Sequence, residues 1–237
     1  MAVKKAEVHE DPNQLVVERA KDFWTKYNRP LMIVASIVIL VAGGYLAYKK
    51  FYKEPNEQKA ADALFKAEGY QRNALMAANP DSLFKLALNG DGANPGFLKV
   101  MSKYKGTEAA NLARLYAGEC FIALNDNTNA VKYLKDFSTS SKFFQARADK
   151  LLGDAYADLG KSKDALASYK KAASEFTEDA DNASEALFLA AYLAQTKMND
   201  NKQAIDLFKQ LKEKFPNTQR GSQAEKYLAR LGVYSTD

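Results

Sequence analysis

The sequence predicts an all-α protein in which one apolar helix near the N-terminus precedes an α-solenoid of helix pairs, closed by a C-terminal capping helix. Three observations indicate this fold class. Residues 31–48 form a run without a charged side chain. The 237-residue chain has 12 Gly and 6 Pro, few enough for a largely helical protein. From Thr107 onward, similar residues recur about thirty-five positions apart.

The apolar run Leu31–Tyr48 has the length of a membrane-spanning helix. At 1.5 Å per residue it extends about 27 Å, close to the roughly 30 Å hydrocarbon core of a bilayer. Arg29 precedes it, and Lys49, Lys50 and Lys53 follow it. The preceding stretch is too long and too acidic for a usual signal peptide, and no small-x-small cleavage site ends the run. We therefore expect an uncleaved single-pass signal anchor.

A face of small residues runs along this predicted transmembrane helix. Ala35, Gly43 and Ala47 lie on it. Such faces allow close approach of helices in lipid, so these three residues are candidates for packing against another membrane helix. The alternative is chance, because Gly and Ala are common in spanning helices.

Residues 1–30 are expected to form a polar tail with a short amphipathic helix. Residues 1–10 are polar and should lack structure, and Asp11-Pro12 suits a helix start with Asp11 as N-cap. Trp24 and Tyr27 suit an interfacial anchor, with a docking helix for a partner as the alternative. Asn28-Arg29-Pro30 is expected to break this helix before the spanning one begins.

The orientation of the anchor depends on its flanks. Within twenty residues there are four Lys or Arg before the run and five after it, so the positive-inside rule does not decide. A short tail before a signal anchor usually stays in the cytoplasm. We therefore expect the N-terminus to lie in the cytoplasm and the long C-terminal domain to be translocated across the membrane.

Composition excludes several classes of function. The net charge is +5, but residues 54–237 contain 25 Lys or Arg and 24 Asp or Glu, so the large domain is near neutral and unsuited to nucleic acid. The basic residues beside the run suit membrane lipid headgroups. One Cys, Cys120, and one His, His9, cannot supply a usual zinc site, and we expect Cys120 to be buried. No catalytic, metal or cofactor residues are predicted, and the protein is expected not to be an enzyme.

A linker over residues 49–56 is expected to lead into a helical domain over residues 57–233. Helices are predicted over 57–78, from Asp81 or Ser82 to Leu88, and over 97–104. The turn-rich stretch between the last two, residues 89–96, superficially suggests a calcium loop, but Val100 stands where the bidentate acidic ligand is needed. We interpret this stretch as a connector.

The periodic residues define helix pairs. The middle unit has Gly153, Tyr156, Gly160, Ala165 and Tyr169, and the units on either side keep parts of this pattern, such as Gly118 with Ala130. Small residues at Gly118 and Gly153 should let the first helix of a pair approach the second. This pattern resembles the tetratricopeptide repeat over about residues 107–216, with residues 222–231 as a capping helix. Arg114 and Asp149 stand where that family has a large aromatic residue.

The resemblance also implies where ligands bind. In tetratricopeptide repeats, exposed positions of the first helices form a concave face that commonly holds peptides. The corresponding partner-binding candidates are Glu119, Ile122, Arg147, Lys150, Asp154, Asp158, Phe188 and Tyr192. Their charges are mixed, which disfavours short acidic tails and leaves extended or partly unfolded segments as ligands.

The layout of a short tail, one signal anchor and tetratricopeptide-like repeats resembles the single-pass ancillary subunits of the bacterial Sec translocon. Those subunits partner a membrane-anchored periplasmic peptidyl-prolyl isomerase. The resemblance implies an inner-membrane adaptor or chaperone that binds proteins at the Sec channel and assists newly exported polypeptides. The alternative is a structural scaffold of another envelope complex, for secretion, cell-wall or outer-membrane assembly.

Overall fold

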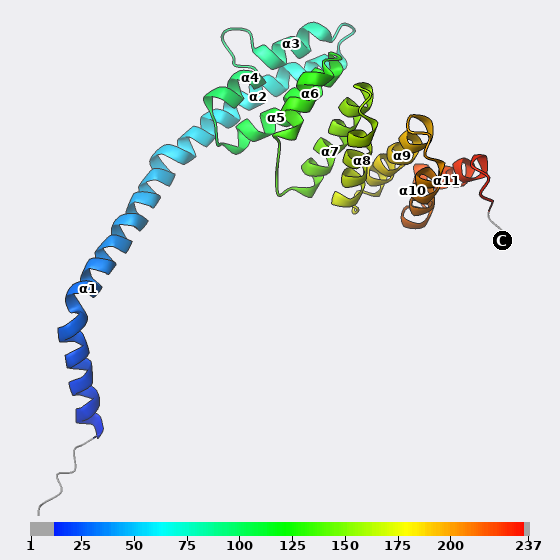
Figure 1. The fold of residues 1–237 in the computed structure, drawn as a ribbon. Coiled ribbons are helices and arrows are strands. Elements are labelled where there is room, and N and C mark those ends of the chain that lie inside the picture. The colour runs from blue at the N-terminus through cyan, green and yellow to red at the C-terminus, as the bar shows by residue number, and fades with distance from the viewer. Residues whose placement is uncertain (1–11, 235–237) are drawn as a thin grey trace, which may run out of the picture. The chain divides into compact units, whose positions relative to one another are not determined.

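The structure, a computed structural model, describes residues 12–234. The described regular elements are all helices, and the only other pairing among them is an isolated bridge between Gly90 and Pro95. This confirms the predicted all-α class. The chain divides into two compact units, one ending at Pro55 and the other beginning at Asn56. Figure 1 shows the helices in chain order.

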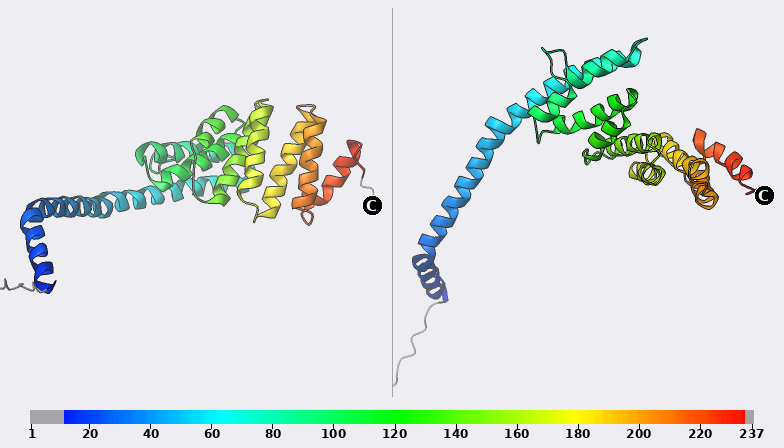
Figure 2. Two further views of the ribbon diagram at one scale, coloured as in Figure 1. Left: turned by 60° about the horizontal axis from the view of Figure 1, so that its bottom comes forward. Right: turned by 45° about the horizontal axis from the view of Figure 1, so that its top comes forward.

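The first unit consists mainly of α1, Pro12–Tyr48. The expected helix break at Asn28-Arg29-Pro30 is wrong, because Pro30 lies inside this continuous helix. An interior proline removes one backbone hydrogen bond and displaces the preceding turn, but the remaining bonds on both sides hold the helix together. Figure 2 shows that α1 bends instead of ending. The expected N-cap Asp11, the tail over residues 1–10 and His9 lie outside the described residues.

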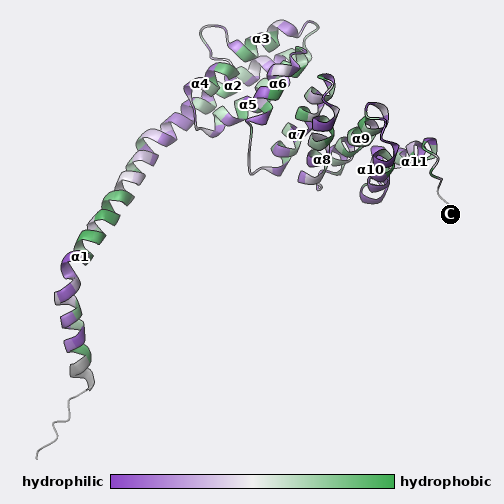
Figure 3. Cartoon of the chain, in the orientation of Figure 1, coloured by the Kyte–Doolittle hydropathy of each residue, from purple (hydrophilic) through white to green (hydrophobic). Residues whose placement is uncertain are grey.

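The apolar part of α1 satisfies the length and composition of a membrane-crossing helix, and none of this stretch is buried within the structure. Figure 3 shows its hydrophobic residues in the part of α1 that lies toward α2. Such a helix near an N-terminus is compatible with a membrane anchor and also with a signal sequence. Residues Lys49–Lys53 form a π-helix, η1, which continues directly into α2, Glu54–Met76. The stretch expected as a linker, residues 49–56, is therefore helical.

The second unit is a succession of short helices. Ahead of the periodic region, α2 is followed by α3, Asp81–Asn89, and α4, Phe97–Lys103. The pairs that follow are α5, Glu108–Ala123, with α6, Asn127–Lys135; α7, Lys142–Asp158, with α8, Ser162–Glu175; and α9, Ala180–Thr196, with α10, Asn201–Lys214. The last described helix is α11, Gln219–Arg230. These bounds match the predicted helical repeats and capping helix.

The turns within the pairs explain why each first helix ends where it does. Asn125, Gly160 and Asn199 have φ values of 59°, 71° and 54°, and each lies between the first and second helix of its pair. This left-handed backbone suits Gly and Asn, which tolerate it at least cost. Asp126 and Asp200 then cap the second helices by accepting hydrogen bonds from Asn129 N at 3.1 Å and Gln203 N at 2.9 Å.

Close packing within the pairs depends on the predicted glycines. A Cβ atom on Gly118 would lie 2.5 Å from Leu134 Cγ, and one on Gly153 would lie 2.5 Å from Tyr169 Cδ1. Real carbon contacts are longer, so only hydrogen fits at either site. Ala130 and Ala165 are fully buried in the opposing helices. The expectation that these small residues bring the paired helices together is confirmed.

The buried core has two parts. Buried residues of α2 to α7 form one cluster, and those of α8 to α11 form a second. Helix α11 closes the array, since Tyr227 stacks on Phe208 with ring centroids 5.0 Å apart and meets Phe188 edge-on at 5.1 Å. Cys120 is buried as expected, and burial raises the pKa of its thiol to about 12.

Candidate functional site

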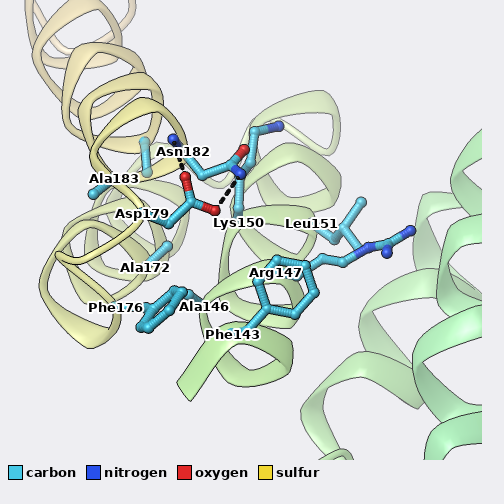
Figure 4. A pocket seen from close by; sticks show the side chains of 11 residues that line it. Phe143, Ala146, Arg147, Lys150, Leu151, Ala172, Phe176, Asp179, Asn182 and Ala183 are labelled. Atoms are coloured by element: carbon cyan, nitrogen blue, oxygen red, sulfur yellow. Dashed lines mark hydrogen bonds between the residues drawn. The ribbon is translucent and has the colours of Figure 1, made fainter. Parts of the chain in front are cut away.

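The first helices of successive pairs, α7 and α9, border a groove whose floor is completed by the C-terminal end of α8. We call it the α7–α9 groove, and Figure 4 shows the side chains that line it. Its volume is about 340 Å³. The lining residues are Phe143, Ala146, Arg147, Lys150, Leu151, Ala172, Phe176, Asp179, Asn182, Ala183 and Ala186.

Helical spacing places these side chains on common faces. Phe143, Arg147 and Lys150 follow one another at i, i+4 and i+7 along α7, so they project from one side of that helix. The beginning of α9 contributes a second such face, with Asp179, Asn182, Ala183 and Ala186 at i, i+3, i+4 and i+7. Alanines of α7, α8 and α9 form much of the floor, which keeps the groove open because their side chains are short.

Two aromatic rings lie at one end of the groove. Phe143 keeps 43% of its surface exposed, and its ring meets Phe176 edge-on at 6.3 Å between centroids. Phe143 also contacts Phe144 at 5.3 Å. An aromatic ring held by neighbours yet open to solvent offers contact area at low entropic cost, which suits recognition of an apolar side chain.

The charged groups along the groove are held in ion pairs and hydrogen bonds. Arg147 Nε lies 2.7 Å from Glu119 Oε1 on α5, and Lys150 Nζ lies 2.9 Å from Asp154 Oδ2. Asp179 accepts hydrogen bonds from Asn182 N at 3.2 Å and from Asn182 Nδ2 at 2.7 Å (Figure 4). Both cations remain partly accessible, with 45% of the Arg147 side chain and 31% of the Lys150 side chain exposed. The groove therefore combines an apolar floor with charges of both signs.

Glu119 is the most enclosed of these charged residues. Its side chain is 13% exposed and also accepts a hydrogen bond from Gln71 Nε2 at 3.0 Å. Burial raises the pKa of its carboxyl, and Arg147 and Gln71 only partly oppose that effect. Burial likewise raises the pKa of the Tyr116 hydroxyl, which the acidic groups Glu68 and Glu119 reinforce. The side chains of Gln71, Glu119 and Arg147 thus form a polar network that links α2, α5 and α7, and this region is not an open binding surface.

The structure brings some of the predicted partner-binding residues together and separates others. Arg147 and Lys150 line the groove, and Glu119 adjoins it through Arg147. Asp154 is engaged by Lys150 and by the hydroxyl of Tyr169, whose O–H donates to Asp154 Oδ1 at 2.8 Å.

The remaining predicted residues lie elsewhere. Asp158 accepts a hydrogen bond from Asn127 Nδ2 of α6 at 3.2 Å, so it belongs to the contact with the preceding pair. Ile122 is half-buried against the first core cluster. Tyr192 is 44% exposed and stacks on Phe188 at 6.0 Å, beyond the lining of the groove.

The expectation that Phe188 is exposed for a ligand is wrong. Its ring is buried against Phe208 and Tyr227, and the Arg220 guanidinium lies over it at 4.2 Å. Arg220 Nη2 also donates to Glu185 Oε1 at 3.0 Å. Phe188 is buried because α11 packs against α9 and covers a surface of α9 that would be exposed if the repeats ended at α10.

Sequence reasoning missed the aromatic end of the groove. Phe143 and Phe176 come from the beginning of α7 and the residue after α8, which are far apart in sequence. The i, i+4, i+7 spacing of Phe143 with Arg147 and Lys150 was the available signal for Phe143. Nothing local to Phe176 marks it, because its role comes from packing across the pair.

The predicted membrane-packing residues are accessible. Ala35, Gly43 and Ala47 are all exposed in α1, and a Cβ atom on Gly43 would meet nothing within 4 Å in the described residues. Their packing against another membrane helix stays a prediction.

A tetratricopeptide repeat family model matches residues 112–140 and 185–218. The first match covers most of α5 and all of α6, and the second covers most of α9, all of α10 and the residues leading into α11. No curated protein and no solved structure matches the chain. Tetratricopeptide repeats bind proteins and are typical of non-enzymatic scaffolds. The two matched stretches are therefore similar to tetratricopeptide repeats and follow a long apolar N-terminal helix. Such repeats suggest a protein–protein interaction adaptor.

Proposed function

We propose that this protein is a single-pass, non-enzymatic inner-membrane adaptor whose repeats bind other proteins through the α7–α9 groove. The observation that carries the proposal is the groove itself, with its apolar floor and the exposed ring of Phe143. Within the described residues no segment of the chain fills it. An extended polypeptide is a suitable ligand, since its side chains can reach the floor while its polar groups meet Arg147, Lys150 and Asn182.

The proposed location is the bacterial inner membrane, with the N-terminus in the cytoplasm and the repeats in the periplasm. The long exposed apolar stretch of α1 and the lysines of η1 support membrane anchoring. The proposed partners are the Sec channel and a periplasmic peptidyl-prolyl isomerase, with newly exported polypeptides as ligands of the groove. This assignment rests on the resemblance in layout described above.

Affinity purification from native membranes tests the proposed partners and the role of the apolar helix. The full chain carries a C-terminal tag and is solubilised in mild detergent beside a variant in which residues 31–48 are replaced by an unrelated spanning helix. Co-purification of Sec channel subunits and an isomerase, weakened by the replaced helix, is the expected result. Stable recovery of another envelope complex instead would contradict the Sec assignment and favour the scaffold alternative.

Membrane topology has a separate test. Protease added to intact spheroplasts should degrade the repeat domain and leave the N-terminal part protected. A chain recovered without residues 31–48, in soluble form, would show that the apolar stretch is a cleaved signal sequence.

A further inference from the structure

A second groove lies on the other set of helices, between α8 and α10. We call it the α8–α10 groove. Its volume is about 510 Å³, and it shares Lys170, Leu207 and Gln210 with an adjoining hollow of about 340 Å³ near the beginning of α10. The two hollows therefore form one continuous surface along the second helices of neighbouring pairs. None of the partner-binding residues predicted above lines it.

The floor of the α8–α10 groove is apolar. It is formed by Ala173, Leu187, Leu207 and Phe215, which come from α8, α9, α10 and the residue after α10. Each of these is largely buried by its own neighbours, so the floor is part of the second core cluster. Ser174, Thr177 and Gln210 also line the groove. The Ser174 hydroxyl donates to Lys171 O at 3.0 Å, and Thr177 and Gln210 can exchange hydrogen bonds with a peptide backbone.

Three lysines and no acidic residue are among the residues that line the larger hollow. Lys171 is paired with Asp149, with Nζ 3.0 Å from Oδ1. Lys170 and Lys214 are exposed, and neither forms an ion pair within the described residues. Two ammonium groups beside an apolar floor attract a carboxylate that brings apolar surface with it.

The adjoining hollow, at the end near the beginning of α10, has a different charge balance. Asp200 and Asp206 line it together with Lys202 and with Lys170, which belongs to both hollows. Asp200 is used as the cap of α10, accepting from Gln203 N at 2.9 Å. Two carboxylates at this end repel a continuous polyanion, such as nucleic acid or a layer of anionic lipid, and tolerate a ligand whose negative charge is local.

We propose that the α8–α10 groove docks an acidic segment of a partner protein, with glutamates or aspartates at Lys170 and Lys214 and an apolar side chain over the floor. This inference does not depend on the α7–α9 groove. Because the two grooves use different sets of helices, one repeat domain offers two protein-binding surfaces, which is what an adaptor that joins two proteins requires.

Peptide binding to the full chain in detergent tests this proposal. The probe is a short fluorescein-labelled peptide with glutamates beside leucine and phenylalanine, measured by fluorescence anisotropy. We expect K170E/K214E to weaken binding by at least about tenfold, because both attractive charges become repulsive. The same peptide with glutamine at every glutamate should bind weakly to both proteins. A benzophenone-bearing form of the peptide should crosslink to residues of α8 and α10.

The matched control is K163E/K209E, which changes the same net charge on the same two helices at exposed lysines outside the groove lining. It should bind the peptide as the unchanged protein does. The proposal is overturned if K170E/K214E binds normally, if both double variants lose binding equally, or if crosslinks fall outside the residues that line the two hollows. Competition by inorganic polyphosphate as strong as that by unlabelled peptide would show a general anion surface and would also overturn it. Circular dichroism of both variants must match the unchanged protein for the comparison to hold.

Discussion

Gly153 of α7 lies directly against the ring of Tyr169 in α8, so close that a Cβ atom would be 2.5 Å from Tyr169 Cδ1. The same tyrosine donates its hydroxyl proton to Asp154, the residue after this glycine, at 2.8 Å. A single contact between two helices thus combines close packing with a partly buried hydrogen bond. Asp154 in turn holds Lys150, which lines the α7–α9 groove. Packing inside the pair therefore positions a side chain of the candidate site.

Gly153→Ala is expected to destabilise the domain by about 1–3 kcal/mol, the usual cost of adding a methyl group to a filled core. The Tyr169 ring must move, and its bond to Asp154 weakens. Thermal unfolding of the full chain in detergent, followed by circular dichroism, measures the change. Gly69→Ala is the control, because that helical position in α2 has nothing within 4 Å of a Cβ atom and alanine favours helix there. Equal destabilisation by both substitutions would contradict the packing argument.

The Glu119 carboxyl gives stability a predictable dependence on pH. Burial raises its pKa in the folded state above the usual value of 4.5, so the folded protein binds its proton more tightly than the unfolded chain does. This contribution to stability is fully present below about pH 4.5 and is lost as pH rises through the raised pKa. Glu119→Gln cannot ionise and keeps an amide oxygen for Gln71.

The variant and the unchanged protein should therefore have similar melting temperatures in mild acid, and Glu119→Gln should gain relative stability as pH rises toward 8. Melting curves across this range measure the difference. Arg147→Met removes the partly exposed cation beside Glu119 and leaves the enclosed carboxylate without its ion-pair partner. This variant should therefore be less stable than the unchanged protein at neutral pH. If Glu119→Gln instead loses stability relative to the unchanged protein as pH rises, the attraction between Glu119 and Arg147 outweighs the effect of burial on the Glu119 carboxyl.

Phe143→Ala is expected to reduce the recovery of groove-bound partners about tenfold or more, because exposed aromatic anchors commonly contribute most to an interface. Its effect on folding should be small, since the ring is 43% exposed. Quantitative mass spectrometry of purified complexes measures the recovery. Leu159→Ala is a suitable control, as Leu159 is an exposed apolar residue at the end of the same helix and does not line the groove. Loss of partners in both variants would argue against the groove.

Cys120 should resist thiol reagents in the folded protein. The side chain is fully buried, and its pKa of about 12 leaves almost no thiolate at neutral pH. Maleimide treatment at pH 7.5 should leave the native mass unchanged and add one label after denaturation. Ser140→Cys, at an exposed position between α6 and α7, should be labelled at once in the native state. Rapid labelling of Cys120 in the native protein would mean that α5 opens readily.

The sequence by itself determined the helical class, the place of the apolar run, and the spacing of the repeats. These follow from local properties: the uncharged run at 31–48, the glycines at 118 and 153, and turn residues such as Gly160 each act within one helix or one pair. The sequence did not predict that α1 continues through Pro30. The tendency of proline to break a helix was outweighed by the helical hydrogen bonds on both sides of it.

The tertiary structure alone decided which side chains form the grooves. Phe176 joins Phe143 only when α8 folds back on α7, and Phe188 is withdrawn from solvent only because α11 covers α9 with Tyr227 and Arg220. Similarly, Lys170 and Lys214 become neighbours along one groove through the stacking of two pairs. Periodicity specifies which face of a helix is apolar, but burial depends on what the next helix places against that face, and residues distant in sequence supply that contact.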